Sequence, residues 1–255
     1  MYKAFTASDW KKFLKLPENY SVSGFLTYGA YDNDKHFDYL FQTLNRLNIK
    51  YTSKKFTGFL KNIQEFVIDN KTYWFAVVYG GAILSEYEHL ACLFGSNKNI
   101  HIGSCGGLYP EINSLDLIIP IYSYGNESTT RIYAREVLDH KHFSDKNLSK
   151  SLEQKIDEKI KVYNGPIITA QAMMGETWDD VHSWSKDGFY GVEMETAIVF
   201  AVSNHFKVPS SALIYVSDNL IKGQTVCDES HSKEKEVREE IKKEVYKIGI
   251  LSLIE

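Results

Sequence analysis

The sequence predicts a layered α/β fold in a single domain that spans residues 1–255. Its composition, 44% hydrophobic and 24% charged over 255 residues, is typical of a compact chain that buries a full core. Apolar runs rich in β-branched and aromatic residues alternate with segments of helical period, which is the pattern of strands and helices packed in layers. No linker, low-complexity tract or internal repeat divides the chain, so we expect one domain.

Hydrophobic periodicity places the individual elements. Apolar residues at steps of three and four mark a helix from Asp34 and an amphipathic C-terminal helix from Lys233. The polar, glycine-poor segment from Tyr124 to Lys150 predicts a long surface excursion. Helices are expected over residues 34–47 and 83–94, after residue 195, and from 233 onward. Strands are expected at residues 23–29, 65–68, 72–78, 99–102, 115–121, 162–168 and 212–216.

Charge and composition argue against several classes of partner. Lys and Arg number 29 against 33 Asp and Glu, a net charge of −4, so nothing favours nucleic acid or an anionic membrane surface. No apolar run approaches the roughly 18 residues of a membrane span. The first residues lack the apolar core of a signal peptide, and we therefore expect a cytoplasmic protein.

The cysteines and histidines do not form a recognisable metal or disulfide pattern. Cys92, Cys105 and Cys227 are too few and too scattered for a disulfide framework, and an odd number suits a reducing compartment. The eight histidines include no HExxH pair and no cluster at ligand spacing. We therefore expect no bound metal.

Three segments carry residues that could bind a ligand or take part in catalysis. The first, Gly-Ser-Cys-Gly-Gly at residues 103–107, follows the strand expected at 99–102, and its glycines would let a loop backbone approach an anion with its N–H groups. Its spacing fits neither a dinucleotide-binding nor a nucleoside-triphosphate loop. On spacing alone, a tight turn that needs glycine only for its geometry is the simpler alternative.

The second segment, residues 191–197, has glutamates on both sides of a methionine, directly before an apolar helix. Glu195 would lie near the N-terminus of that helix, where the helix dipole favours its ionised form. A carboxylate there can accept paired hydrogen bonds from a sugar diol. The alternative is a helix-terminal charge without a ligand, which is disfavoured because acids in an apolar stretch are costly without partners.

The third segment, residues 211–220, is an apolar strand that ends in Ser-Asp-Asn. Asp218 would lie at the carboxyl end of this strand, where α/β sheets commonly bind ligands. An Asx turn that simply closes the strand is the alternative.

Together, in their order and spacing, these segments resemble the nucleoside phosphorylase and nucleosidase family. That family groups purine nucleoside and uridine phosphorylases with methylthioadenosine and AMP nucleosidases. Residues 103–107 are similar to its GSCG loop, residues 191–195 to its VEME motif, and residues 216–219 to the SD motif of its purine-acting members. Residues 80–85 are similar to a glycine-containing turn of the family. The resemblance covers nearly the whole chain and is strong from Gly103 onward.

The resemblance implies a three-layer α/β/α fold with a mixed central sheet, a homo-oligomer, and a purine nucleoside as the small-molecule substrate. It implies no cofactor, with inorganic phosphate as co-substrate if the reaction is phosphorolysis. The catalytic residues it implies are Asp218, which would act at N7 of the purine, and His231. The ribose-binding residues would be Glu193, Met194 and Glu195; the base-binding residues Ala170, Met173 and Val192; and the phosphate-binding residues Gly29, His101 and Ser104.

These residue types fit the cleavage of an N-glycosidic bond. Positive charge then develops on the sugar and negative charge on the departing base. Glu195 would stabilise the first charge, and a protonated or hydrogen-bonding Asp218 would neutralise the second.

The phosphate site departs from the family pattern, because phosphorylases of this family hold phosphate with arginines. Here His101 precedes Ile102, and residues 28–33 contain no arginine. A dianion is bound best by bidentate charged donors. Phosphorolysis and hydrolysis by water therefore both stay open, as does a non-catalytic member that binds nucleosides. A pyrimidine-acting phosphorylase is disfavoured by Asp218.

Overall fold

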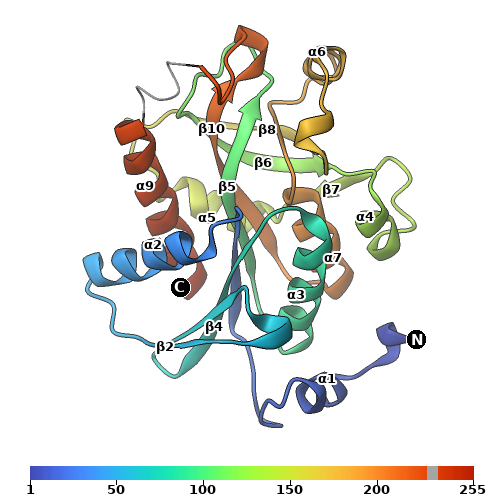
Figure 1. The fold of residues 1–255 in the computed structure, drawn as a ribbon, viewed down its shortest axis with the longest axis vertical. Helices are drawn as coiled ribbons and strands as arrows, with labels where there is room; N and C mark the ends of the chain where they lie inside the picture. The colour runs from blue at the N-terminus through green and yellow to red at the C-terminus, as the bar shows by residue number, and fades with distance from the viewer. Residues whose placement is uncertain (229–234) are drawn as a thin grey trace.

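The computed structural model describes residues 1–228 and 235–255, and in this part of the chain a mixed ten-stranded sheet forms the centre (Figure 1). Nine strands follow the order β10-β6-β8-β9-β5-β1-β4-β3-β2, and β7 pairs with β6. The strands are β1 (Gly24–Gly29), β2 (Thr52–Lys55), β3 (Ile63–Ile68), β4 (Lys71–Val78), β5 (Asn99–Gly107), β6 (Leu117–Tyr124), β7 (Lys141–Phe143), β8 (Val162–Thr169), β9 (Gly191–Glu193) and β10 (Ser210–Asn219). β1 is parallel to β4 and β5, whereas β3 is antiparallel to β2 and β4, which confirms the mixed α/β prediction.

Helices cover both faces of this sheet, as the three-layer prediction requires (Figure 1). Leu40 of α2 and Ile248 of α9 belong to the core on one face, and Leu84 of α3 and Ile198 of α7 to the core on the other. Because side chains alternate along a strand, a strand buried on both faces becomes a continuous apolar run. The helices are α1 (Ala7–Phe13), α2 (Asn33–Arg46), α3 (Gly81–Leu93), α4 (Ser128–Tyr133), α5 (Lys146–Glu153), α6 (Trp178–Lys186), α7 (Thr196–Phe206) and α9 (Lys235–Ile254).

The tight turn expected between residues 68 and 72 joins β3 to β4. Asp69 and Asn70 have positive φ angles of 49° and 61°. Two consecutive residues in this left-handed region match the strand twist of a two-residue hairpin, and Asp and Asn tolerate it better than most residues. The hairpin prediction is therefore confirmed.

β5 lies at the centre of the sheet and pairs with three other strands. It pairs in parallel with β1 and β10, and its last residues, Gly106 and Gly107, pair with β9. β10 also pairs with β6, β6 with β8, and β8 with β9, so these five strands form a closed ring. The backbone at this junction is closely covered: a Cβ on Gly106 would lie 2.8 Å from Leu220 Cδ1, and one on Gly107 would lie 2.9 Å from Val216 Cγ1, so these side chains would have to move.

One local prediction is wrong. Residues 103–107 form the second half of β5 instead of a loop, because β9 and β10 pair with them. The segment from Tyr124 to Lys150 lies mainly at the surface, as expected, but it contains α4, β7 and the start of α5, and it buries Thr130 and His142. Such short elements carry too few residues to show a hydrophobic period.

The C-terminal helix is confirmed over Lys235–Ile254, while its expected start at Lys233 lies outside the described residues. His231 lies outside them as well. In the two described segments, no helix combines the length and the apolar composition needed to cross a membrane.

Candidate active site

A pocket of about 350 Å³ opens where β1, β5 and β10 end and where β9 leads into α7. Its walls bring together segments that are distant in sequence, in agreement with the rule that ligands bind at the carboxyl ends of parallel strands. Eight of the residues singled out in the sequence line it: Gly29, Ser104, Met173, Val192, Glu193, Met194, Glu195 and Asp218.

Glu195 is the residue that precedes α7, and its carboxylate is buried against two glycine-containing turns. Its Oε1 accepts a hydrogen bond from the Gly80 N–H at 2.6 Å. On the other side, a Cβ on Gly29 would lie only 2.5 Å from Glu195 Oε2. The sidechain therefore fits only because position 29 has no Cβ.

Burial, and then the neighbouring Glu193 carboxylate, raise the pKa of Glu195 to about 8. The sequence-based expectation that this group is ionised is therefore wrong. Loss of water and the Glu193 carboxylate outweigh the backbone hydrogen bonds, that of Gly80 among them, which lower the pKa. At neutral pH the group holds a proton, which it can lose when a positive charge develops beside it.

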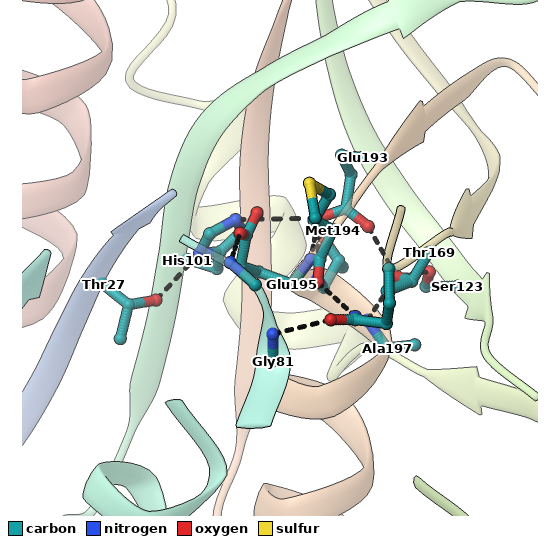
Figure 2. A network of polar contacts seen from close by, with 12 residues as sticks. Thr27, Gly81, His101, Ser123, Thr169, Glu193, Met194, Glu195 and Ala197 are labelled. Atoms are coloured by element: carbon teal, nitrogen blue, oxygen red, sulfur yellow. Dashed lines mark hydrogen bonds and ion pairs between the residues drawn. The ribbon is translucent and has the colours of Figure 1, made fainter. Parts of the chain in front are cut away.

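Glu193 is also buried, but its oxygens bind the protein itself (Figure 2). Oε2 accepts hydrogen bonds from the backbone N–H groups of Glu195 and Thr196, at 2.8 and 2.7 Å, at the start of α7. Oε1 accepts one from the Thr169 hydroxyl at 2.5 Å. Burial nevertheless raises its pKa. This geometry makes Glu193 a residue that positions Glu195, and its predicted contact with ribose stays a prediction.

His101 lies behind Glu193 and is not among the residues that line the pocket. Its Nδ1 is hydrogen-bonded to the Thr27 hydroxyl at 2.8 Å, and its Nε2 lies 3.8 Å from Glu193 Oε2 (Figure 2). Burial lowers the pKa of His101 to about 3. The imidazole is therefore neutral at physiological pH and supplies no positive charge for a phosphate.

His101, Glu193 and Glu195 also offer three possible metal ligands within 4.8 Å of one another. Two ligands of a tetrahedral zinc ion would lie about 3.4 Å apart. The 3.8 Å between His101 and Glu193 is longer than this, and Glu193 Oε2 already accepts two backbone hydrogen bonds. The group would have to contract and give up these bonds to hold zinc.

Asp218 reaches the same pocket from β10. The pairing of β10 with β5 shifts by one residue here: Val216 lies opposite Cys105, and Asp218 lies opposite Gly106. Such a bulge redirects a side chain out of the regular alternation of a strand. The Ser217 hydroxyl donates a hydrogen bond to Asp218 Oδ1. The turn that closes the strand is made by the next residue, because Asn219 Oδ1 accepts a hydrogen bond from the Lys222 N–H at 3.1 Å. The Asp218 side chain is therefore left to line the pocket.

The remaining predicted residues occupy the rim or lie beside it. Met173 is 43% exposed and Met194 is half-buried, and both line the pocket, as does the buried Val192. Ala170 is not a lining residue, but its N–H donates to the Glu193 carbonyl at 2.8 Å. Ala170 therefore helps to hold β9, the strand that carries Val192 and Glu193.

Sequence reasoning missed Glu176 and Tyr79, which also line the pocket. Glu176 is an isolated acid three residues after Met173, and no local pattern marked it as a site residue. Within the described chain, the pocket lining includes no Lys or Arg but four carboxyl groups, those of Glu176, Glu193, Glu195 and Asp218.

A larger cavity, about 560 Å³, lies between the N-terminal segment and helices α3 and α4. Its lining is mainly aromatic and apolar, with Tyr2, Phe5 and Trp10 among it. It lacks the three buried acids that the smaller pocket holds, Glu193, Glu195 and Asp218, and we therefore assign the chemistry to the smaller one.

Comparison with known structures supports a nucleoside phosphorylase fold. A uridine phosphorylase from Vibrio fischeri ES114, solved in complex with 6-hydroxy-1-naphthoic acid, superposes with a TM-score of 0.74 over 94% of this chain and 93% of its own. The two sequences are 15% identical, so this similarity concerns the fold alone.

Sequence comparison identifies the family. The model of the phosphorylase superfamily matches residues 82–255, well over half of the chain, and the protein therefore belongs to that superfamily. A DeoD-type purine nucleoside phosphorylase from Thermoanaerobacter sp. (strain X514) is 28% identical over 134 residues, which are 52% of this chain and 58% of the relative. A DeoD-type 2 enzyme from Vibrio vulnificus (strain YJ016) is 23% identical over 201 residues, 73% of this chain and 84% of the relative. The matched region thus spans little more than half the length of the first of these relatives.

Proposed function

We propose that this protein cleaves the N-glycosidic bond of purine nucleosides. The observation that supports this most strongly is that Glu195 and Asp218, from separate elements, line one pocket. A nucleoside needs two different partners for this reaction, one at the sugar and one at the leaving base. The DeoD-type relatives, which are named as purine nucleoside phosphorylases, favour a purine.

The roles follow from the position and chemistry of each group. Glu195 accepts hydrogen bonds from the ribose hydroxyls and, once ionised, stabilises the positive charge that develops on the sugar. Met194 contacts the sugar ring. Asp218 faces the base and neutralises the charge that builds up on N7. Glu193 and Thr169 hold Glu195 in place from behind.

Water is the nucleophile that this pocket favours. A phosphate dianion would enter a pocket whose described lining has several carboxyl groups and no Lys or Arg. The neutral His101 adds no positive charge that would hold the dianion. A water molecule needs only hydrogen-bonding partners, and the buried carboxyl groups provide them. The products are then the free base and the free sugar.

Phosphorolysis, which yields sugar 1-phosphate, is the second candidate. It is favoured by the relatives' names and by the presence of Gly29 and Ser104 in the pocket lining. Whether the reaction uses phosphate or water, we propose that it needs no other cofactor. We further propose that the protein works as a homo-oligomer.

The test is a base-release assay on adenosine, inosine and uridine, with and without inorganic phosphate, followed by chromatography. We expect release of purine bases in phosphate-free buffer and little release of uracil. Release that strictly requires phosphate would favour phosphorolysis. Tight binding of purine nucleosides without any release would instead indicate a non-catalytic member of the family.

A further inference from the structure

Gln171 is an exposed residue outside the pocket lining that neither the sequence motifs nor the proposed roles use. It comes two residues after the end of β8, and its side-chain amide is hydrogen-bonded at both ends. Its Oε1 accepts from the Gly81 N–H at 2.9 Å, and its Nε2 donates to the Met194 carbonyl at 2.6 Å (Figure 2). One exposed side chain therefore joins the start of α3 to the residue before Glu195.

The N-terminus of α3 has no capping side chain of its own, because its N-cap residue is Gly80. The first N–H groups of a helix have no partner within the helix and need one elsewhere. Here distant side chains supply it. Glu195 Oε1 accepts from the Gly80 N–H at 2.6 Å, and Gln171 Oε1 accepts from the next N–H, that of Gly81. Glu195 and Gln171 thus cap one helix together.

These hydrogen bonds close a ring. Gly80 and Gly81 are neighbours in the chain, as are Met194 and Glu195. The Gly80–Glu195 contact joins the two pairs on one side of the ring, and Gln171 joins them on the other. The first contact holds a carboxylate oxygen, whereas the second holds the backbone that carries the carboxylate. Both ends of the Glu195 residue are therefore tied to α3.

A second contact joins the same two parts of the chain. The Tyr79 hydroxyl donates to Met173 Sδ at 3.9 Å. Both of these side chains line the pocket, whereas Gln171 does not. Replacing Gln171 therefore breaks a connection between the two segments and leaves every side chain of the pocket lining unchanged.

We propose that Gln171 is a positioning residue, which holds Met194 and Glu195 in place for the sugar of the nucleoside. The inference rests on the proposed function, because it takes the sugar to lie at these two residues. Without the amide, water can bind both backbone groups, since the Gln171 side chain is exposed. The Met194 backbone is then no longer tied to α3, and the Glu195 carboxyl group loses one of the connections that set its position.

The base should be affected much less than the sugar. Asp218, the proposed partner of the base, belongs to β10, and the pairing of β10 with β5 and β6 holds it independently of Gln171. Loss of the amide should therefore weaken the binding of a nucleoside and leave the binding of the free base unchanged. A general loosening of the pocket would weaken both.

Titration calorimetry with adenosine and adenine measures this difference without requiring turnover. Gln171→Met keeps an unbranched side chain of similar size and removes both hydrogen bonds. Gln42→Met, at an exposed glutamine on α2, is the matched control and should bind both compounds as wild type does. We expect Gln171→Met to bind adenosine about tenfold more weakly than wild type, and adenine within about twofold. Retained binding of adenine also shows that the pocket of the variant is folded.

A double-mutant cycle on kcat for adenine release shows whether Gln171 acts through Glu195. Gln171→Met should lower kcat by about tenfold in the wild-type background, but by about twofold or less in the Glu195→Ala background. A purely structural role would lower kcat by the same factor in both, and this result would contradict the proposal.

The binding data separate this proposal from the proposed function. Equal adenosine affinity in wild type and Gln171→Met, or equal losses for adenosine and adenine, would overturn the assignment of Gln171 while purine release still proceeds. A wild-type protein that neither binds nor cleaves adenosine would overturn the proposed function together with this inference.

Discussion

The Gly80 N–H donates a hydrogen bond to Glu195 Oε1 at 2.6 Å, across 115 positions of sequence. This contact joins the turn after β4 to the first residue before α7. It holds one carboxylate oxygen, while Gly29 provides the space for the other. The group that we propose to bind the sugar is therefore fixed by backbone geometry before any substrate arrives, as catalytic preorganisation requires.

Replacing this carboxylate should remove most of the activity. Glu195→Ala should lower kcat for purine release by about a hundredfold or more, because the charge on the sugar loses its stabilising partner. Steady-state kinetics with adenosine measures the effect, and Glu158→Gln serves as the surface control. Near-normal kcat in Glu195→Ala would remove this residue from the reaction.

Adding one methyl group at Gly29 should displace the same carboxylate. A Cβ there would lie 2.5 Å from Glu195 Oε2 and 2.9 Å from its Cδ, so the side chain must move. Displacements of this size cost about tenfold to a hundredfold in kcat/KM. In a double-mutant cycle, Gly29→Ala should cost much less in a Glu195→Ala background. Full additivity of the two changes would contradict the predicted clash.

Asp218→Asn tests the group proposed at the leaving base. We expect kcat for purine release to fall by about a hundredfold, because an amide cannot deliver a proton to N7. The exposed Asp38 on α2 supplies the matched control, Asp38→Asn, which should retain wild-type rates. Normal turnover of inosine and adenosine by Asp218→Asn would exclude Asp218 from this role.

The buried Thr169 side chain is hydrogen-bonded to three residues next to Glu195 or behind it. Its hydroxyl donates to Glu193, accepts from the Ala197 N–H at 2.9 Å, and is hydrogen-bonded to Ser123 (Figure 2). Thr169→Val should therefore reduce the free energy of unfolding by about 1–3 kcal/mol, since buried polar groups lose their partner. Denaturant titration measures this. Thr57→Val, at an exposed threonine whose side chain does not cap its helix, should change stability by less than about 0.5 kcal/mol.

Stability should depend on pH through Glu195. Its pKa rises from the ordinary value of 4.5 to about 8 in the folded protein. Between these values the folded state holds a proton that the unfolded state has released, so stability falls as pH rises towards 8. Glu195→Gln removes this dependence. The melting temperature of Glu195→Gln, relative to wild type, should therefore increase from about pH 5 to pH 8.5. A constant difference between the two proteins would contradict a raised pKa.

Secondary structure could be predicted from the sequence wherever it depends on a short run of neighbouring residues. The apolar strands around Phe25 and Ile214, the hairpin at Asp69 and the buried helix after Glu195 all follow from short patterns, and the structure confirms them. Motif spacing also predicted two acids from distant segments. The structure shows that Glu195 and Asp218 share one pocket, which spacing alone does not reveal.

What sequence reasoning missed depends on contacts between distant segments. The glycines from Gly103 to Gly107 look like a loop, yet β9 and β10 pair with that segment and make it a strand. The pKa of Glu195 follows from burial and from Glu193, neither of which a helix-terminus rule includes. Glu176 follows the short 3-10 helix Met173–Gly175 and lines the pocket together with Asp218 of β10, and no residue pattern encodes that placement.

Isotopic labelling provides the most direct measurement of the reaction. The protein is incubated with adenosine in phosphate-free, oxygen-labelled water, and the sugar product is analysed by mass spectrometry. We predict free adenine and ribose that carries the label at C1, with both products strongly reduced in Glu195→Ala and Asp218→Asn. Intact adenosine after prolonged incubation, or product that forms equally well in the two variants, would contradict the account.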